Sequence, residues 1–324
     1  MVARYVIYGA GAIGGCIGGA LATAGHEVVL VARGEHLAAM QSRGLRMLTP
    51  AGEQRPPAVA VGSAAEARVG RDDVVVIATK SQDTEAVVTD LASTGVTPAA
   101  VVCAQNGVDN ERVVARRGLP AYGMYVVVPA AYQEAGVVEL YGSPVGGVLD
   151  LGRFPTGSDE IAAAVASDLT RAGFSAEASA DIMRWKYAKL LDNVGNALDA
   201  ACGFEAREHS LFARARAEAQ ACFAAAGIHP VSAEDTRARA AVLSGRLPVS
   251  GRQYPGSSSW QSLARGTGSI EADWLNGEIV LLGTQYGIST PVNAMLQRTA
   301  NRMARQRLAP GTLAIADLEA QLAR

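Results

Sequence analysis

The sequence predicts a mixed α/β domain followed by an all-α domain, and three observations support this prediction. A short strand-like run at 4–8 leads into the glycine-rich stretch 9–14, and further apolar runs of strand length follow. From about Asp181 the strand signals fade and an alanine-rich helical periodicity replaces them. The chain has 324 residues and 49% apolar content, which is enough for two buried cores. We therefore expect one domain over 1–180 and a second over 181–324.

The first expected elements are a strand, a glycine turn and a helix, in that order. The strand covers Arg4 to Tyr8, the turn is Gly9-Ala10-Gly11-Ala12-Ile13-Gly14, and a helix of small residues covers 15–23. This order is typical of the Rossmann dinucleotide-binding domain. The first glycine makes the tight turn, the second lets a pyrophosphate approach the backbone, and the third lets helix and strand pack closely. The phosphate is expected at the helix N-terminus, where unpaired amides favour an anion.

The next element is a strand over 27–32, and Arg33 stands at its end. An enzyme that uses NAD usually has an acid at this position to bind the ribose 2′-hydroxyl, whereas a guanidinium suits a 2′-phosphate. The sequence therefore favours NADP(H), although Glu35 could weaken that preference. The alternative interpretation is that Arg33 is an ordinary exposed arginine, one of 26 in the chain.

Two near-continuous apolar runs, 73–79 and 99–105, read as strands of a parallel sheet that is covered on both faces. In such a sheet the ligand lies outside the carboxyl ends of the strands. Lys80 follows the first run and Asn106-Gly107 follows the second, so we expect both at the ligand-binding edge. Asn-Gly is also an ordinary turn signal, which is the alternative for that pair.

The rest of the first domain is expected to hold three more strands and a helix. The strands cover 126–131, 137–141 and 148–151. The helix covers 158–172, with Ser158 as its N-cap and acids in its first turn.

Lysine is rare in this chain, which has only three lysines beside its 26 arginines, and two of them lie close together at Lys186 and Lys189. An ammonium can hand over a proton, whereas a guanidinium stays protonated above about pH 12. In an expected helix over 182–201, Lys189 shares a face with Asn193 and Asn196. The alternatives are a coding bias against lysine, or pairing of these groups with nearby aspartates.

Three more helices are expected in the second domain. They cover 207–226, 270–283 and a final segment that begins with Thr290 as N-cap and Pro291 at the first helical position. The arginines of the final helix are interpreted as a solvated face. The expected loops are 49–57, 94–98 and 247–259.

Composition narrows the range of partners. A net charge of -2 and a pI near 6.1 argue against a nucleic-acid partner or an anionic membrane surface, so we expect a small-molecule partner. The four cysteines lack metal-site spacing, and we interpret them as reduced core residues with no metal. No export signal is evident, so we expect a cytoplasmic location. The sequence does not set the oligomeric state, which leaves a homodimer open.

Taken together, these features resemble the ketopantoate reductase family. The resemblance spans nearly the whole chain, and its most specific parts are the Lys-Leu-x-x-Asn run at 189–193 and the run IEADWLNG at 270–277. It implies a Rossmann domain, an all-helical domain and an active site in the cleft between them. It also implies NADPH-dependent reduction of 2-dehydropantoate to pantoate, a step toward pantothenate and coenzyme A.

The resemblance also implies roles for individual residues. Lys189 matches the general acid, and Glu271 matches the acid that positions the substrate oxygen. The positions that match substrate contacts are Asn106, Asn193, Asn196 and Ser258, and those that match cofactor contacts are the glycine turn, Arg33, Lys80 and Asn106. Ser259 is the alternative to Ser258 if the count runs back from Glu271.

Two departures from the family pattern bear on the substrate. Pro255 stands where a substrate-binding asparagine is expected, and Asn196 lies one place early. Another NADP-dependent β-hydroxyacid or opine-type dehydrogenase is therefore the alternative enzyme. A non-catalytic NADP-binding sensor is the alternative of another class, and the joint presence of Lys189, Asn193 and Glu271 argues against it.

Overall fold

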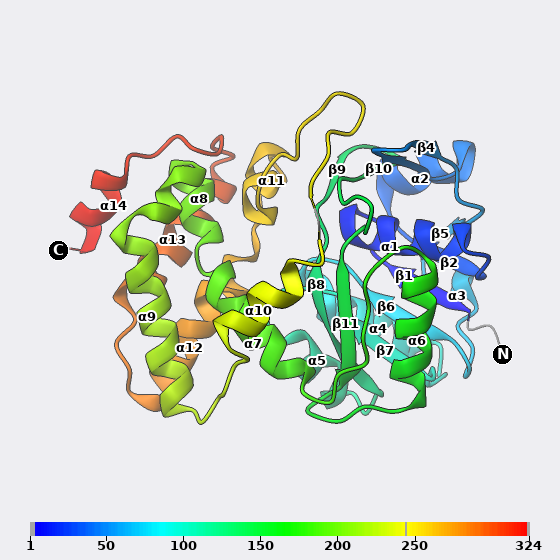
Figure 1. Ribbon diagram of the computed structural model, residues 1–324, viewed down its shortest axis with the longest axis horizontal. Helices are drawn as coiled ribbons and strands as arrows, with labels where there is room; N and C mark the ends of the chain where they lie inside the picture. Colours follow the sequence, from blue (N-terminus) through cyan, green and yellow to red (C-terminus); the bar gives the residue numbers. More distant parts are fainter. Residues whose placement is uncertain (1–3, 244, 323–324) are drawn as a thin grey trace. The chain divides into compact units, whose positions relative to one another are not determined.

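The computed structural model describes residues 4–243 and 245–322 (Figure 1). The chain divides into two compact units. Unit 1 holds the chain up to Gln105, together with Asn110–Lys186 and Ser232–Tyr254. Unit 2 holds Asn106–Asp109, Tyr187–Val231 and the chain from Pro255 onward. This division differs from a single boundary at 180/181, because the chain enters unit 2 more than once.

Unit 1 is built on a seven-stranded sheet, as the Rossmann-like prediction requires. Its strands, in spatial order, are β11 (Val148–Arg153), β8 (Ala121–Val127), β7 (Ala100–Cys103), β6 (Val74–Ile77), β1 (Tyr5–Tyr8), β2 (Val28–Val31) and β5 (Val59–Val61). All neighbouring strands pair in parallel except β11, which pairs antiparallel with β8. The carboxyl ends of β1, β6 and β7 therefore lie at one edge of the sheet, where the glycine turn and Lys80 follow.

Helices cover this sheet on both faces. They are α1 (Ala12–Thr23), α2 (Gly34–Arg43), α3 (Ala64–Ala67), the 3₁₀ turn η1 (Ser81–Asp83), α4 (Thr84–Ser93), α5 (Asn110–Arg116) and α6 (Glu160–Arg171). Side chains alternate between two cores because successive residues of a strand face opposite ways. In β1, Tyr5 and Ile7 join the core shared with α1 and α6, while Val6 and Tyr8 join the core shared with α3 and α4.

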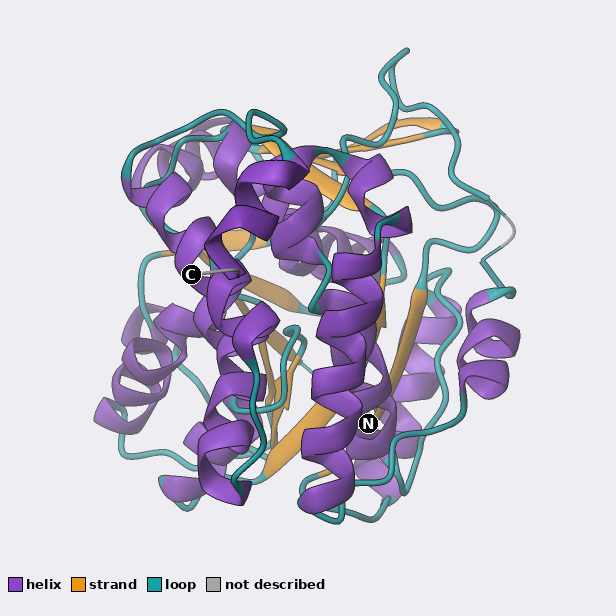
Figure 2. Cartoon of the chain, turned by 90° about the vertical axis from the view of Figure 1, so that its left-hand side faces the viewer, coloured by secondary structure: helices purple, strands orange, loops and turns teal. Residues whose placement is uncertain are grey.

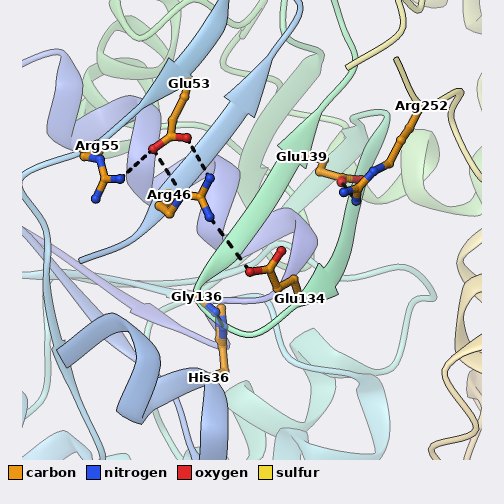
Figure 3. Close-up of polar contacts among 8 residues, drawn as sticks. All are labelled: His36, Arg46, Glu53, Arg55, Glu134, Gly136, Glu139 and Arg252. Atoms are coloured by element: carbon orange, nitrogen blue, oxygen red, sulfur yellow. Dashed lines mark hydrogen bonds and ion pairs between the residues drawn. The ribbon is translucent and has the colours of Figure 1, made fainter. Parts of the chain in front are cut away.

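A second, four-stranded sheet packs against the other side of α1. Its order is β4 (Gly52–Gln54), β3 (Arg46–Thr49), β10 (Val137–Leu140) and β9 (Ala130–Glu134). Glycines let α1 fit between the two sheets. A Cβ on Gly15 would lie 2.6 Å from Val138 of β10, and one on Gly18 would lie 2.7 Å from Leu30 of β2. Arg46 of this sheet pairs with Glu53 and Glu134, as Figure 3 shows.

The segment Ser232–Tyr254 belongs to unit 1, although the chain on both sides of it belongs to unit 2. It begins with α10 (Ala233–Ala240). Arg239 of this helix is buried and pairs with the buried Asp150 of β11, with Nε 2.7 Å from Oδ2. Farther along, Arg252 donates to Glu139 of β10 at 2.8 Å (Figure 3). Two ion pairs therefore join this late segment to both sheets.

Helices make up the regular structure of the described part of unit 2 (Figure 2). They are α8 (Asn196–Cys202), η2 (Phe204–Glu208), α9 (Ser210–Ala225), α11 (Ser258–Ala264), η3 (Glu271–Trp274), α12 (Asn276–Tyr286), α13 (Pro291–Arg305) and α14 (Ile315–Leu322). One further helix, α7 (Ile182–Asn193), begins in unit 1 and continues in unit 2 from Tyr187. An α/β unit and a helical unit are thus present, as predicted.

Several local predictions were wrong. The strand expected over 126–131 is two strands, because β8 ends at Val127 and β9 begins at Ala130 in the other sheet. The loop expected over 49–57 contains β4, which pairs antiparallel with β3. The cap of α6 is Asp159 instead of Ser158, since the Asp159 carboxylate accepts the amide of Ala162.

The long helix expected over 182–201 is interrupted. It splits into α7 and α8 around Val194 and Gly195. A Cβ on Gly195 would lie 2.7 Å from the ring of Phe212, so the small residue allows α9 to approach this break. The helix expected over 270–283 likewise splits into η3 and α12, with Leu275 between them. Thr290 and Pro291 begin α13 as predicted, although the Thr290 side chain makes no capping bond.

Three of the four cysteines are buried, and none is in a disulfide. Among the described residues, no helix is both long enough and apolar enough to cross a membrane.

Candidate active site

The glycine turn has the geometry that its spacing predicts. Gly9 has a φ of +88°, and a Cβ there would lie 2.7 Å from the amide nitrogen of Thr79. A Cβ on Gly14 would lie 2.2 Å from the Gly9 carbonyl oxygen. A Cβ on Gly11, by contrast, would meet no atom within 4 Å. Gly9 and Gly14 are therefore required by packing, while Gly11 keeps the space in front of the helix open.

The N-terminus of α1 can hold an anion. Gly11 is the N-cap residue, so no side chain caps the helix, and no acid stands in its first turn. The first amides of a helix have no partner within the helix, and the helix dipole favours negative charge at that end. The 12-residue helix α1 therefore begins next to a glycine with free space around it, and this N-terminus suits a pyrophosphate.

His36 joins the glycine turn to the second sheet. Its Nδ1 lies 2.8 Å from the amide nitrogen of Gly136, and its Nε2 lies 2.7 Å from the carbonyl oxygen of Ala10 (Figure 3 shows His36 beside Gly136). Because the Gly136 N–H can only donate, Nδ1 is the acceptor, and Nε2 carries the hydrogen that it donates to Ala10. Burial lowers the pKa of His36, which keeps this neutral tautomer.

A buried polar network lies where β6 and β7 end. The Gln105 amide nitrogen donates to the Thr79 carbonyl at 3.0 Å and to the Thr84 hydroxyl at 2.8 Å. The Thr84 hydroxyl in turn donates to the side chain of Asn110. Two buried atoms here have no hydrogen-bond partner among the described residues, namely the Thr79 hydroxyl oxygen and the Gln105 side-chain oxygen. These two oxygens, at the edge of the sheet where a ligand is expected, can therefore form hydrogen bonds with a ligand.

Lys186 has a structural environment. Its side chain is only 3% exposed, and Nζ lies 2.6 Å from Oε1 of Glu111, whose side chain is fully buried. The same Nζ donates to the carbonyl oxygen of Gln105 at 2.9 Å. A buried ammonium needs such compensation. This lysine thus fixes the start of α7 on the end of β7.

Arg33 lies at the end of β2, as predicted, and is the N-cap residue of α2. Its side chain is 85% exposed, and its Nη2 lies 3.0 Å from Oδ1 of Asp83. Asp83 ends the turn η1 that follows Lys80, and its amide donates to the Lys80 carbonyl at 2.9 Å. The predicted cofactor residues Arg33 and Lys80 thus share one neighbourhood with a carboxylate that the sequence reasoning missed.

In unit 2, the predicted acid Lys189 and the predicted ligand Asn193 lie on α7, four residues apart. Lys189 is half-buried, and Asn193 is 7% exposed. The amide nitrogen of Asn193 is buried and has no hydrogen-bond partner within the described ranges. A buried donor without a partner costs about 1–3 kcal/mol, so this amide is suited to donate a hydrogen bond to a ligand oxygen.

Asn196 does not continue the stripe of Lys189 and Asn193, because it begins the separate helix α8. Its side-chain oxygen accepts from Arg207, whose Nε also donates to Asp199 at 2.7 Å. Asp199 accepts a further bond from the Ser257 hydroxyl at 2.6 Å. Burial raises the pKa of Asp199, and the Arg207 charge opposes that shift.

The three consecutive serines at 257–259 have different roles. Ser257 is the N-cap of α11, since its hydroxyl accepts the Trp260 amide at 3.2 Å. The hydroxyls of Ser258 and Ser259 make no hydrogen bond to the described part of the chain, and Ser258 is the more exposed of the two. Ser258 can therefore offer its hydroxyl to a ligand, whereas Ser257 already bonds to Asp199.

The run from Ile270 to Gly277 holds one predicted site residue, Glu271, and one buried residue with a structural role, Asn276. Glu271 begins η3 and is 4% exposed. Asn276 is fully buried, and its amide nitrogen donates to the Val194 carbonyl at 2.9 Å and to Asn293 at 3.0 Å. Asn276 therefore binds the backbone at the break between α7 and α8. No signal in the sequence revealed this role.

Asn106 and Gly107 were expected at the edge of the main sheet, and the contacts assign both to unit 2. Gly107 has a φ of +78°, and a Cβ there would lie 3.0 Å from the Trp274 carbonyl oxygen. Glycine is required at this turn for both reasons. The Asn-Gly pair is thus a tight turn as well as a candidate ligand contact.

Two models of one protein family match most of the chain. The family model described as ketopantoate reductase PanE/ApbA matches residues 5–155, and the model of its C-terminal part matches residues 181–304. The 2-dehydropantoate 2-reductase of Archaeoglobus fulgidus is 31% identical over 304 residues, which are 91% of this chain and 96% of that protein. The 2-dehydropantoate 2-reductase of Pyrococcus horikoshii is 32% identical over 192 residues, which are 59% of this chain and 60% of that protein, less than two thirds of its length.

A solved structure extends the likeness to the fold of nearly the whole chain. The PanE/ApbA family ketopantoate reductase of Ralstonia eutropha JMP134 has a TM-score of 0.77 and 28% sequence identity, and the match covers 94% of this chain and 99% of that one. With both family models matched, and with 31% identity across almost the full length of a relative, this chain belongs to the ketopantoate reductase family, a family of dinucleotide-binding oxidoreductases.

Proposed function

We propose that this protein uses NADPH to reduce a 2-oxo acid, and that the 2-oxo acid is 2-dehydropantoate, which becomes pantoate for pantothenate and coenzyme A synthesis. The names of the relatives support this substrate. The observation that carries the proposal is the buried amide of Asn193, a donor without a partner among the described residues, one helical turn after Lys189. A donor and a proton source on one helix face suit an oxygen-rich substrate.

The cofactor fits unit 1 on three grounds. The N-terminus of α1 offers unpaired amides, Gly11 leaves the approach open, and the side-chain oxygens of Thr79 and Gln105 lack partners among the described residues. We propose that the turn Gly9 to Gly14 holds the pyrophosphate, with Lys80 and Arg33 contributing positive charge. When bound, the reduced nicotinamide supplies a hydride to the carbonyl carbon of the substrate.

In this proposal Lys189 is the general acid. As the carbonyl carbon gains a hydride, the electron pair of the C=O π bond moves to oxygen, and the Lys189 ammonium gives that oxygen a proton. The product is the hydroxy acid, and the neutral amine then takes a proton from water. General acid catalysis of this kind contributes roughly 100- to 10,000-fold in rate.

The other proposed substrate contacts are side chains with hydrogen-bonding capacity in unit 2. The Asn193 amide donates to a substrate oxygen, and the Ser258 hydroxyl donates to the carboxylate. Glu271 positions the substrate oxygen, and Asn106 and Asn196 contribute further polar contacts. For Asn196 this contact uses the amide nitrogen, because Arg207 already donates to its oxygen.

The test is a turnover assay that follows NADPH absorbance with 2-dehydropantoate and with a panel of other 2-oxo acids. We expect kcat/KM for 2-dehydropantoate to exceed that for each other acid by at least about 10-fold, the ratio that ~1.4 kcal/mol of selective transition-state binding gives. A higher kcat/KM for a different 2-oxo acid would support the proposed reductase activity but would assign it a different substrate. Absence of turnover with every acid, despite NADPH binding, would contradict the enzymatic proposal.

Substitutions of Lys189 test the acid. Lys189→Ala and Lys189→Arg should each lower kcat by about 100-fold or more, because neither side chain can hand over a proton near neutral pH. The arginine variant keeps the positive charge, so it separates proton transfer from electrostatic binding. Arg184→Ala is the matched control, because it removes an exposed cation from the same helix. Equal kcat for Lys189→Arg and the unaltered protein would exclude Lys189 as the acid.

A second candidate is another NADP-dependent β-hydroxyacid or opine-type dehydrogenase. Pro255 favours it, because proline has no side-chain donor at a position where a substrate-binding asparagine is expected. Pro255→Asn distinguishes the two candidates. If 2-dehydropantoate is the substrate, kcat/KM for it should already be high in the unaltered protein, and this change should leave it nearly unaltered. If kcat/KM for 2-dehydropantoate is low and rises only in this variant, another oxo acid is the natural substrate.

A further inference from the structure

Asp83 forms an ion pair with the arginine that is predicted to recognise the cofactor 2′-phosphate. Arg33 Nη2 lies 3.0 Å from Asp83 Oδ1, and both residues belong to unit 1. Arg33 follows β2, and Asp83 follows β6, the strand that pairs with the far side of β1. The contact therefore brings together residues 50 positions apart at the carboxyl edge of the sheet.

The carboxylate is the better fixed partner of this pair. The Asp83 side chain is 28% exposed, and its amide bonds to the Lys80 carbonyl within η1. Asp83 is also the N-cap residue of α4, although its side chain makes no capping bond. Arg33, by contrast, is 85% exposed. The position of the negative charge is thus set by η1 and α4, and the guanidinium lies against it.

Other charged groups in this neighbourhood do not take the place of Asp83. Glu35 stands in the first turn of α2 and makes no ion pair within the described part of the chain. Glu85 pairs with Arg117. Lys80 is the N-cap residue of η1 and adds a positive charge. Among these acids, Asp83 is the one that pairs with Arg33 in the described part of the chain, so it joins Glu35 as a candidate for weakening the preference for NADP(H).

A carboxylate and a guanidinium at this place favour different cofactors. A guanidinium binds a 2′-phosphate, whereas a carboxylate accepts a hydrogen bond from a ribose 2′-hydroxyl. A phosphate that binds Arg33 must also approach Asp83, and like charges at such distances repel. A 2′-hydroxyl carries no charge and has a hydrogen to donate.

We propose that Asp83 is a specificity-determining residue: it lowers the preference for NADP(H) that Arg33 confers, and it lets the same site accept NAD(H) through the ribose 2′-hydroxyl. This inference rests on the proposed function, because it assumes a dinucleotide at the glycine turn. We therefore expect the dissociation constants of NADP(H) and NAD(H) to differ by no more than about 10-fold.

The experiment measures dissociation constants of NADP⁺ and NAD⁺ by titration calorimetry on the full chain, without any oxo acid. In Asp83→Asn we expect the ratio of the NAD⁺ constant to the NADP⁺ constant to rise by about 10-fold or more, because a charge that repels the phosphate is removed. In Arg33→Ala the ratio should fall. Asp72→Asn is the matched control, because Asp72 is exposed and precedes β6 at the opposite end of the strand.

Each remaining outcome has a defined meaning. An unchanged ratio in Asp83→Asn overturns the inference, and so does a fall, since Asp83 would then orient Arg33 for the phosphate. A rise in Glu35→Gln without one in Asp83→Asn also overturns it and assigns the effect to Glu35. Thermal unfolding shows whether Asp83→Asn is folded. If it folds poorly, the same titrations are made on Asp83→Ser. Failure of the unaltered chain to bind either dinucleotide contradicts the proposed function itself, whereas normal binding with an unaltered ratio contradicts this inference alone.

Discussion

His36 holds the carbonyl oxygen of Ala10 at 2.7 Å from its Nε2, so a histidine outside the glycine turn fixes the backbone within it. The same ring accepts the amide of Gly136 through Nδ1. The turn that is expected to receive the cofactor is therefore tied to the second sheet by one neutral imidazole.

We predict that His36→Ala lowers the free energy of unfolding by about 1–3 kcal/mol, because two buried backbone groups lose a partner. The dissociation constant for dinucleotide should rise as well, since the Ala10 carbonyl is no longer held. Urea unfolding and calorimetric titration measure the two effects. His229→Ala, at an exposed position in unit 2, is the control. Unaltered dinucleotide affinity in His36→Ala would show that the turn keeps its shape without the ring.

The lowered pKa of His36 also predicts a pH dependence. In the folded protein the neutral ring is favoured, whereas in the unfolded chain the ring titrates near its usual value of ~6.5. The unfolded state thus binds more protons as the pH falls below about 6.5, and the contribution of His36 to stability is lost over that range. Above it, the contribution is fully present. The difference in unfolding free energy between pH 7.5 and pH 5.5 should be smaller in His36→Ala than in the unaltered protein, and an equal difference would contradict this assignment.

Two alanine substitutions in the glycine turn should have opposite consequences. Gly11→Ala should leave the melting temperature nearly unchanged, because its Cβ meets no atom within 4 Å, yet it should abolish dinucleotide binding by filling the open approach. Gly14→Ala should unfold the protein at a lower temperature, because its Cβ would lie 2.2 Å from the Gly9 carbonyl oxygen. Thermal unfolding and cofactor titration on both variants check the contrast. Strong dinucleotide binding by Gly11→Ala would place the pyrophosphate elsewhere.

The ion pair of Arg239 and Asp150 should matter far more than an exposed one. Arg239→Met leaves the buried Asp150 carboxylate without its charge partner and should cost about 3–5 kcal/mol. Arg46→Met breaks the exposed pairs with Glu53 and Glu134, and its effect should lie near the measurement error, because water and salt screen such pairs. Urea unfolding of both variants provides the comparison. Similar losses in the two variants would mean that the buried pair is not specially important.

Asn276 should prove structural although it lies within the most family-specific run of the sequence. Asn276→Asp keeps the shape of the side chain but removes the donor that binds the Val194 carbonyl and Asn293. We expect a loss of about 1–3 kcal/mol in unfolding free energy. Asn301→Asp is the control, because its bond to Asp273 lies at the surface. A fall in turnover without any loss of stability would instead indicate a direct catalytic role for Asn276.

The sequence predicted the features that depend on local pattern. The strand, glycine turn and helix at the start were found where the spacing put them, because Gly9 and Gly14 leave no room for a side chain and Gly11 keeps the approach to the helix open. The apolar runs of β6 and β7 were recognised for the same reason, since strands buried on both faces show no polar interruption.

Features that depend on distant contacts were missed. At the break between α7 and α8, Gly195 leaves room for Phe212 of α9, and the helical periodicity of the sequence runs through the break without a signal. The partners of His36 are 26 and 100 positions away in the chain, and Asp83 is 50 positions from Arg33. A local sequence pattern cannot predict such pairs, because the partners come together only in the folded chain.

The return of residues Ser232–Tyr254 to unit 1 has a consequence for how the chain is synthesised. Because Arg239 is the partner of Asp150, a nascent chain that has left the ribosome only as far as Val231 still has an unneutralised carboxylate on β11. Domains usually fold as they emerge, beginning with the N-terminal one. Here the N-terminal unit cannot be completed until much of the following helical unit has been translated, so expressing it as a separate fragment should yield an unstable product.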